Sequence, residues 1–382
     1  MRRTNERREN SCRGDEFRHT FVALVLAVAT ARLFAQAPVP PALGGPAAAP
    51  ATVASDLIAI LEARLAKIPG TTGVFVTQLG TGAEAGVRAD QAFSSASVIK
   101  LTFLVRAFQL ADAGTLDLGE RVMLDRTHLR HGTGIFQFKD PGLQPTWRDL
   151  LTEMVITSDN TATDLVLMKI GGPAAVTEWL KGAGYTGLQS FGRPHDYRRD
   201  LLARLDPAFA QLTAEETTGL LYAMDGNPLF DRYATLFTGP RAAWVTTATD
   251  AANKRRFALE RNELTSADRA FWLGAMTPRD TGRLLAAIER DTAASPASCA
   301  AMRQMLRNQQ LGTRRLPRYV SIPVGHKTGD GGTIANDAGI LYAPSGPVVV
   351  AVFASGLTGD YGDAEDEIGR LGRDVVDYFG RQ

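Results

Sequence analysis

The sequence predicts an α/β (α+β) three-layer sandwich, in which an antiparallel sheet is flanked by helices and joined to an all-helical part. Two observations support this fold class. Strand-like runs lie near both ends of the chain, and the long middle has mostly helical patterns. Helices between two parts of one antiparallel sheet are typical of such a sandwich. We expect the sheet part over residues 55–96 and 321–382, and the helical part over about 97–320.

The N-terminal part of the sandwich is expected to begin with a helix capped by Ser55. Its apolar face has helical spacing and consists of Leu57, Ile58, Leu61 and Leu65. Two strands follow, over residues 73–79 and 84–88, around a turn at Gly80–Gly82. The next segment, Ser97 to Leu110, is apolar almost all round, which predicts a buried central helix.

The remaining elements are read in the same way. Helical patterns cover residues 147–157 and 161–170, and the segment 190–275 gives no clear assignment. Strands over 339–342 and 347–354 flank a four-residue turn, which predicts a hairpin. A last helix has its apolar residues at helical spacing, namely Ile368, Leu371, Val375 and Phe379.

The first 35 residues have the pattern of an export signal. Arginines crowd residues 1–19, an apolar run covers 21–31, and the small residues Ala35 and Ala37 follow. The apolar run is shorter than the roughly 20 residues that a spanning helix needs. We therefore expect a cleaved signal peptide over 1–35 and a Pro/Ala-rich linker over 36–54, with an uncut anchor as the alternative. The mature protein would be periplasmic or secreted, without stable membrane insertion.

Charge and cysteine content exclude several classes of protein. The chain has 42 basic and 41 acidic residues, which argues against a nucleic-acid binder that uses a basic patch. Its cysteines are Cys12, within the signal, and Cys299, so a disulfide scaffold is excluded. Apolar neighbours of Cys299 predict a buried helix face. His128 and His131 form an H-x-x-H string without further clustered ligands, and we expect no metal or cofactor.

Three short motifs carry the chemistry. Ser97-Val-Ile-Lys100 begins the buried helix, and its i, i+3 spacing puts serine and lysine on one face. A lysine among apolar side chains has a lowered pKa, so it can take a proton and activate the serine as a nucleophile. Ser158-Asp-Asn160 lies between two helices, and Lys327-Thr-Gly329 precedes the closing hairpin. Each string alone is common, and each has a plain structural explanation as a helix cap or strand residue.

Together, in this order and these settings, the motifs resemble those of class A β-lactamases and the wider family of penicillin-recognising serine enzymes. The resemblance spans roughly residues 55–382 and includes Ile170-Gly-Gly-Pro173 and Asn336-Asp337. It implies the serine β-lactamase/D,D-peptidase fold. It also implies a small-molecule substrate, a monomer in solution and no nucleic-acid partner.

The resemblance also implies roles for the motif residues. Ser97 would attack the β-lactam carbonyl, Lys100 would exchange its proton, and Ser158 would relay a proton to the leaving nitrogen. The other residues would bind the substrate: Asn160 its amide, and Lys327 and Thr328 of Lys327-Thr-Gly329 its carboxylate. The backbone N–H groups of Ser97 and Asp330 would stabilise the oxyanion. Phe136 would be an aromatic gate or, equally, a core residue.

The sequence departs from the class A pattern at the glutamate that activates the deacylating water. The usual E-x-x-L-N string is absent between Ser158 and Lys327, an interval longer than is usual in the family. The nearest match is Glu263, in Arg-Asn-Glu-Leu ahead of Thr277-Pro278, with Glu260 and Glu215 as poorer matches. All three have the alternative of being surface glutamates.

The strand motif also departs from the pattern, because the usual small residue after Lys-Thr-Gly is Asp330. The arginine frequent before the Asn-Asp pair is Ala335. A carboxylate near an anionic substrate and a missing arginine predict weaker binding of the substrate carboxylate.

These patterns predict an exported serine hydrolase that opens β-lactam rings through an acyl-enzyme on Ser97. Two alternatives stay open. One is an esterase or D-alanyl peptidase on the same fold. The other is a penicillin-binding protein that is acylated without turnover. The strings H-E-x-x-H, Walker A and G-x-S-x-G are absent, so metalloprotease, NTPase and α/β-hydrolase functions lack support.

Overall fold

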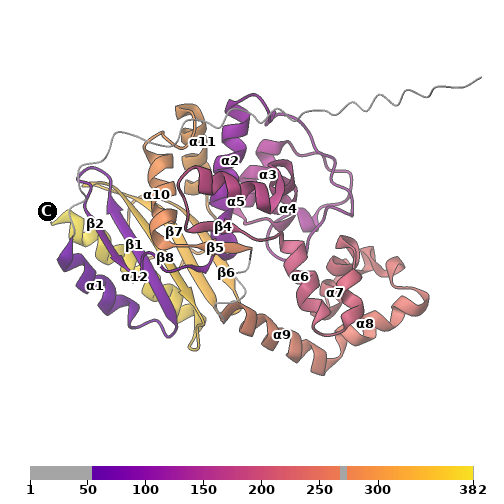
Figure 1. Cartoon of the computed structure of the whole chain (residues 1–382). Helices are drawn as coiled ribbons and strands as arrows, with labels where there is room; N and C mark the ends of the chain where they lie inside the picture. The colour runs from indigo at the N-terminus through magenta and orange to yellow at the C-terminus, as the bar shows by residue number, and fades with distance from the viewer. Residues whose placement is uncertain (1–53, 267–272, 382) are drawn as a thin grey trace, which may run out of the picture. The chain divides into compact units, whose positions relative to one another are not determined.

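The computed structural model describes residues 54–266 and 273–381. Its main sheet has five antiparallel strands in the order β2-β1-β8-β7-β6 (Figure 1). The strands are β1 (Thr71–Gln78), β2 (Glu84–Val87), β6 (Val324–Gly331), β7 (Ile334–Ala343) and β8 (Gly346–Ser355). Strands from opposite ends of the sequence pair directly, since β1 runs from Thr71 opposite Ser355 to Gln78 opposite Val348. The antiparallel sheet flanked by helices confirms the predicted fold class.

Helices cover both faces of this sheet, because its strands are apolar on both sides. Helices α1 (Ser55–Leu65) and α12 (Tyr361–Gly380) pack on one face, and α10 (Pro278–Glu289) and α11 (Pro296–Arg307) on the other (Figure 1). The alternation of side chains follows the strand period. Val350 and Val352 contact the first helix pair, whereas Val349 and Phe353 join the core beneath the second.

The first helix begins one residue earlier than expected. Ala54 is its N-cap, and no side chain caps it, so the cap expected at Ser55 is wrong. The Ser55 hydroxyl instead lies 3.5 Å from Asp56. The predicted face is largely correct, since Leu57, Leu61 and Leu65 are buried.

The buried central helix is present and is preceded by a 3-10 turn. The turn, η1 (Ala96–Ile99), leads into α2 (Lys100–Asp112). Helices α3 (Trp147–Ile156), α4 (Asn160–Lys169), α5 (Gly172–Gly182) and α11 pack around α2. Phe103, Leu104 and Val105 are fully buried, as an all-round apolar helix requires. Cys299 is buried on α11, where the apolar helix face was expected.

The segment 97–320, expected to be all helical, also contains two short strands. Strands β4 (Leu188–Ser190) and β5 (Gly274–Met276) pair with each other, and β3 (Phe93–Ser94) pairs with β5. In addition, α10 and α11 pack on the main sheet rather than in a separate helical part. The helical part of the fold is therefore smaller than the sequence suggested.

The segment that the sequence left unassigned forms its own helical cluster. Its helices, here called the inserted helices, are α6 (Pro194–Ala203), α7 (Ala214–Asp225), α8 (Ala242–Thr249) and α9 (Ala251–Ser266). Short 3-10 turns join them, and they share a separate apolar core. Leu202, Phe209 and Leu220 at its centre are fully buried.

The signal peptide and linker expected over 1–54 fall almost wholly outside the described residues, as does Cys12. Within 54–266 and 273–381, no helix has both the length and the apolar character that crossing a bilayer requires.

Candidate active site

The turn that carries Ser97 is held from both sides. Asn336 of β7 donates from Nδ2 to the carbonyl oxygens of Ser94 (2.8 Å) and Ser95 (3.2 Å). Gly329 of β6 lies so close that a Cβ there would be 2.7 Å from the Ser95 oxygen. Only glycine therefore lets β6 approach the serine turn. Ala96, with φ of +41°, has a left-handed backbone immediately before Ser97.

Lys100 is fully buried one turn after Ser97. Its Nζ donates to the carbonyl oxygen of Ser158 (2.7 Å) and lies 3.1 Å from Ser158 Oγ and 3.2 Å from Asn160 Oδ1. Burial, with the positive charge of Lys327 second, holds the pKa of Lys100 well below its usual range. This shift favours the neutral form of Lys100, which is the form able to accept a proton.

Ser158 joins the helical side of the site to the sheet side. It lies between α3 and α4 with φ of +55°, a backbone conformation that is uncommon outside glycine. Its carbonyl also accepts a hydrogen bond from Thr133 Oγ1 (2.7 Å). Asp159 then caps α4 by accepting from the Ala162 N–H, so Asn160 begins the helix with its amide beside Lys100.

Lys327, on β6, contacts the Ser158 hydroxyl, because its Nζ lies 3.1 Å from Ser158 Oγ. Burial lowers the pKa of Lys327 to about 8, so it is mainly charged at neutral pH. Thr328 is fully buried, and within the described residues its Oγ1 has no hydrogen-bond partner. The three motifs, far apart in the sequence, thus converge on one hydroxyl.

A cavity of about 520 Å³ opens beside these residues. Ser97, Ser158, Asn160 and Asp330 line one part of it. The loop 131–133 and side chains from α6, α7 and α9 line the rest. The inserted helices therefore contribute directly to the site, which the sequence did not reveal.

Asp330 has a partner that the sequence analysis missed. The buried guanidinium of Arg315 forms an ion pair with its carboxylate, and Tyr361 donates to it from 2.9 Å. Arg315 overcomes the effect of burial and holds the pKa of Asp330 below its usual range. Asp330 thus stays ionised, but Arg315 compensates its negative charge, contrary to the expectation that this charge would act uncompensated on an anionic substrate. Nothing in the local sequence distinguishes Arg315 from its neighbour Arg314.

Phe136 does not line the cavity, and the structure corrects its assignment as an aromatic gate. The ring is buried in the main apolar core, which was the alternative considered for it. Its backbone N–H donates to the Asp159 carboxylate (2.8 Å), so Phe136 helps to hold the loop next to the Ser158 motif.

The expected deacylation base is not identified among the described side chains. Glu263 falls in α9, and its side chain lies outside the described residues. Glu215 pairs with Arg126 and Glu260 with Arg204, and neither lines the cavity. The carboxylates of the described lining are Asp225, 2.6 Å from His131 Nε2, and Asp330. Among the described residues, no group of three potential ligands is placed to hold a metal ion.

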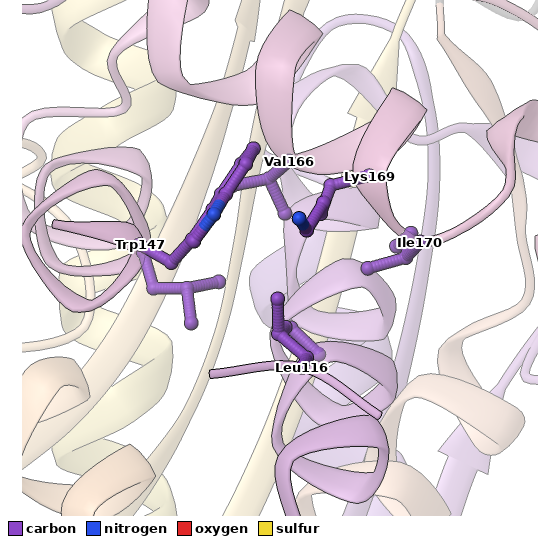
Figure 2. Close-up of a pocket in the computed structure, with 7 residues that line it drawn as sticks. Leu116, Trp147, Val166, Lys169 and Ile170 are labelled. Atoms are coloured by element: carbon purple, nitrogen blue, oxygen red, sulfur yellow. The ribbon is translucent and has the colours of Figure 1, made fainter. Parts of the chain in front are cut away.

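A second hollow lies beside the central helix, bordered by Leu116, Trp147, Val166, Lys169 and Ile170 (Figure 2). The Lys169 ammonium sits 4.9 Å from the centre of the Trp147 ring and also pairs with Glu120. The hollow is too tight to admit a water molecule. It is a packing defect of the apolar core and not a ligand site.

A Ser-x-x-Lys turn, a Ser-Asp-Asn loop and a Lys-Thr-Gly edge strand around one cavity are the arrangement of penicillin-recognising serine enzymes. The sequence model of the β-lactamase enzyme family matches residues 54–237 and 239–379, and the chain belongs to this family.

Individual relatives agree with this family. β-Lactamase L2 of Stenotrophomonas maltophilia is 31% identical over 152 residues, which cover 40% of this chain and 48% of the relative. The chain thus spans about half the length of the curated relatives it matches. A solved β-lactamase of Sphaerobacter thermophilus is 25% identical with a TM-score of 0.61, covering 86% of this chain and 98% of that one.

The fold is also similar to that of PBP-A, of which one mutant was solved as an acyl-enzyme complex with penicillin G. Here the TM-score is 0.63 at 21% identity, covering 87% of this chain and 100% of that one. At this identity the likeness concerns the fold.

Proposed function

We propose that the protein is a class A-like serine hydrolase that opens β-lactam rings through an acyl-enzyme on Ser97. One observation carries the proposal. The Ser158 hydroxyl lies 3.1 Å from the Nζ atoms of both Lys100 and Lys327, beside a cavity that Ser97 also lines. Two buried ammonium groups so close repel each other, and the carboxylates of Asp330 and Asp337 favour the charged form of Lys327, so the proposal takes Lys100 as the neutral partner.

This pair of lysines supports a complete path for the proton in acylation. Ser97 Oγ bonds to the carbonyl carbon while its proton passes to neutral Lys100. The ring C–N bond then breaks, and the proton reaches the departing nitrogen through Ser158. Charged Lys327, with Thr328, binds the substrate carboxylate, and Arg315 compensates the charge of Asp330. The backbone N–H groups of Ser97 and Asp330 stabilise the oxyanion, a contribution of about 3–4 kcal/mol per donor elsewhere.

Deacylation needs a base for the attacking water, and Glu263 is our assignment for it. A second candidate function has support from the site as well. Both carboxylates of the described cavity lining are engaged, Asp225 with His131 and Asp330 with Arg315. This favours slow deacylation, as in a penicillin-binding protein that stays acylated. A D,D-peptidase or esterase would use the same nucleophile.

The proposal includes export of a monomeric enzyme to the periplasm or medium, through cleavage of the signal expected over 1–35. The arginine-rich start and the short apolar run support this part of the proposal. N-terminal sequencing of the mature protein tests it, and a mature chain that begins at Met1 would contradict it.

Intact-protein mass spectrometry during incubation with benzylpenicillin tests the function. We expect a covalent adduct with the unmodified protein and none with Ser97→Ala. Ser345→Ala, in the turn between β7 and β8, is the matched serine control and should be acylated normally. A transient adduct with accumulating product supports a β-lactamase. A persistent adduct supports the acylated binder, and absence of any adduct overturns both.

A further inference from the structure

The cavity contains a positive charge that the proposed acylation chemistry does not use. Arg198 of α6 is half-buried and lines the cavity. Across residues 54–266 and 273–381 its hydrogen bonding is limited to the backbone oxygen of His131, and no carboxylate forms an ion pair with it. Burial lowers its pKa to about 10, so it remains charged at neutral pH. Asp164 and Asp225 act on it only from beyond ion-pair distance. A partly desolvated cation that lacks a direct ion pair within the described residues is costly, and an anionic ligand would relieve that cost.

Arg198 lies next to the substrate-binding amide. Gly132, with φ of +117°, shows this directly, because a Cβ there would collide with the Arg198 guanidinium and lie 2.7 Å from Asn160 Nδ2. Both side chains therefore border the same point of the cavity. Asn160 is the residue proposed to bind the amide of the acyl side chain, so Arg198 reaches the part of the substrate next to that amide.

Beyond Arg198 the cavity wall becomes mostly apolar. The lining side chains are Leu201, Leu221, Met224, Phe257 and Ala258, all from the inserted helices. This part of the cavity suits an aromatic or aliphatic group, which would gain about 25 cal/mol per Å² of apolar surface removed from water.

The charges around the cavity have the same preference. Lys254 and Arg261 add positive charge at its exposed rim. Of the described lining carboxylates, Asp330 is compensated by Arg315, and Asp225 keeps its charge while it forms a hydrogen bond with His131. The cations of the lining, Arg198, Lys254 and Arg261, outnumber these carboxylates, so an anionic ligand meets a net positive charge.

We propose that the inserted helices form a subsite for the acyl side chain, selecting substrates that carry an apolar group together with a carboxylate next to the amide. Arg198 binds the carboxylate, and the apolar wall receives the ring or alkyl group. This inference rests on the proposed function, since it takes Asn160 as the site of the substrate amide.

Benzylpenicillin and carbenicillin form a matched pair of probes, because carbenicillin adds one carboxylate to the carbon beside the side-chain carbonyl. We expect carbenicillin to be preferred, both in dissociation constants for the non-acylating Ser97→Ala protein and in acylation rates with Ser97 present. In either assay, Arg198→Gln should lower the carbenicillin-to-benzylpenicillin ratio about tenfold, the size of one charge-assisted hydrogen bond. The ratio cancels any effect of Arg198 on Lys100, which acts on both substrates.

Arg199→Gln is the matched control. Arg199 is the next residue of α6 and does not line the cavity. Its ion pairs with described residues are long ones, with Asp196 and Asp200. Its loss should leave the ratio unchanged, and Arg198→Lys should retain part of the preference even if Arg198→Gln folds poorly.

The outcomes separate this inference from the proposed function. Acylation by both penicillins with a ratio that does not respond to Arg198 overturns the subsite alone. A ratio of dissociation constants that does respond, without acylation of the protein with Ser97, overturns the proposed function and supports the subsite. Neither binding nor acylation overturns both.

Discussion

The Nζ atoms of Lys100 and Lys327 lie at the same distance from the Ser158 hydroxyl. The question is therefore which of the two lysines carries the positive charge. In the proposed acylation, Lys100 must be neutral, because it accepts the proton of Ser97. Lys327 must be charged, because it is proposed to hold an anionic substrate and to polarise Ser158. Burial lowers the pKa of both. For Lys327 the carboxylates of Asp330 and Asp337 partly offset burial, whereas for Lys100 the cation of Lys327 adds to it, so we expect Lys100 to lose its proton first.

A pH profile of the acylation rate constant tests this division. The rate should rise with pH as Lys100 loses its proton, and should fall again above pH 8 as Lys327 loses its own, because the pKa of Lys327 is about 8. In Lys327→Arg the guanidinium stays protonated, so the alkaline fall should move upward in pH. An unchanged alkaline limb in that variant would assign it to another group.

Arg315 compensates the charge of Asp330 and also contributes to the stability of the fold. It is buried and joins Asp330, Glu365 and the carbonyl of Asn336. We expect Arg315→Gln to lower the free energy of unfolding by about 3 kcal/mol, the low end for a broken buried pair, because Asp330 is partly exposed. Urea denaturation measures this. Arg314→Gln, which removes only an exposed pair with Asp366, should change little. Equal losses in both variants would refute the distinction.

At the scale of elements, the site depends on close approaches that leave no room for side chains. Gly329 lets the edge strand β6 touch the serine turn, and Gly132 lets the loop 131–133 lie against Asn160 and Arg198. Both positions bring together segments distant in sequence. The precision of the site therefore rests on backbone contacts between elements as much as on the catalytic side chains.

Gly132→Ala tests this at one loop. The new Cβ should displace Asn160 and Arg198, and we expect acylation by benzylpenicillin to slow by roughly 10- to 100-fold, as misaligned groups do elsewhere. Gly142→Ala is a matched control, since Gly142 has a similar φ of +105° but no heavy atom within 4 Å of the added Cβ. It shares the backbone strain without the displacement. Comparable losses of acylation in both variants would show that strain alone is responsible.

At the scale of the whole molecule, the inserted helices differ from the rest in having a separate apolar core. Side chains of that core, such as Leu220, do not belong to either core beside the main sheet. Such a unit can open locally without unfolding the sheet, because opening it exposes only its own apolar contacts.

Hydrogen exchange followed by mass spectrometry measures this independence. Leu220→Ala should lower the opening free energy of residues 194–266 by about 2–5 kcal/mol, the usual range for a buried leucine. The strands of the main sheet should exchange as before. Leu371→Ala on α12 removes an equally buried leucine from the core beneath the sheet and should show the reverse pattern. Faster exchange of the sheet in Leu220→Ala would mean that the two parts unfold together.

Strong local patterns made much of this molecule predictable. The sheet, the central helix and the hairpin each have a period or a turn that is visible in a short window. The positions of Ser97, Lys100, Ser158 and Lys327 in their elements followed in the same way. No local pattern predicts that these four residues meet at one site. That expectation came from the resemblance to a family.

The rest depends on tertiary contacts. Nothing in the sequence marks Arg315 or Arg198 among the other arginines. Only their burial, and the carboxylate that pairs with Arg315, set them apart in the structure. Phe136 could be either a gate or a core residue by its residue type, and only its packing in the structure distinguishes the two. The inserted helices are rich in polar residues and short turns, so their apolar periodicity is weak. Ser55 has the residue type of a cap, but it is the first residue of the helix and Ala54 is the N-cap.

The pairing of β4 with β5 has a consequence for how this chain can vary over evolution. The excursion through α6–α9 leaves the fold at Ser190 and returns opposite it at Gly274, so both its ends are fixed by one antiparallel register. The entropy of closing such a loop grows only with the logarithm of its length, about 0.6 kcal/mol for each doubling. Segments here can be gained, lost or exchanged between relatives at small cost to the scaffold. If the inserted helices form the proposed subsite, selectivity for the acyl group can diversify at this one junction while Ser97, Lys100 and Lys327 stay unchanged.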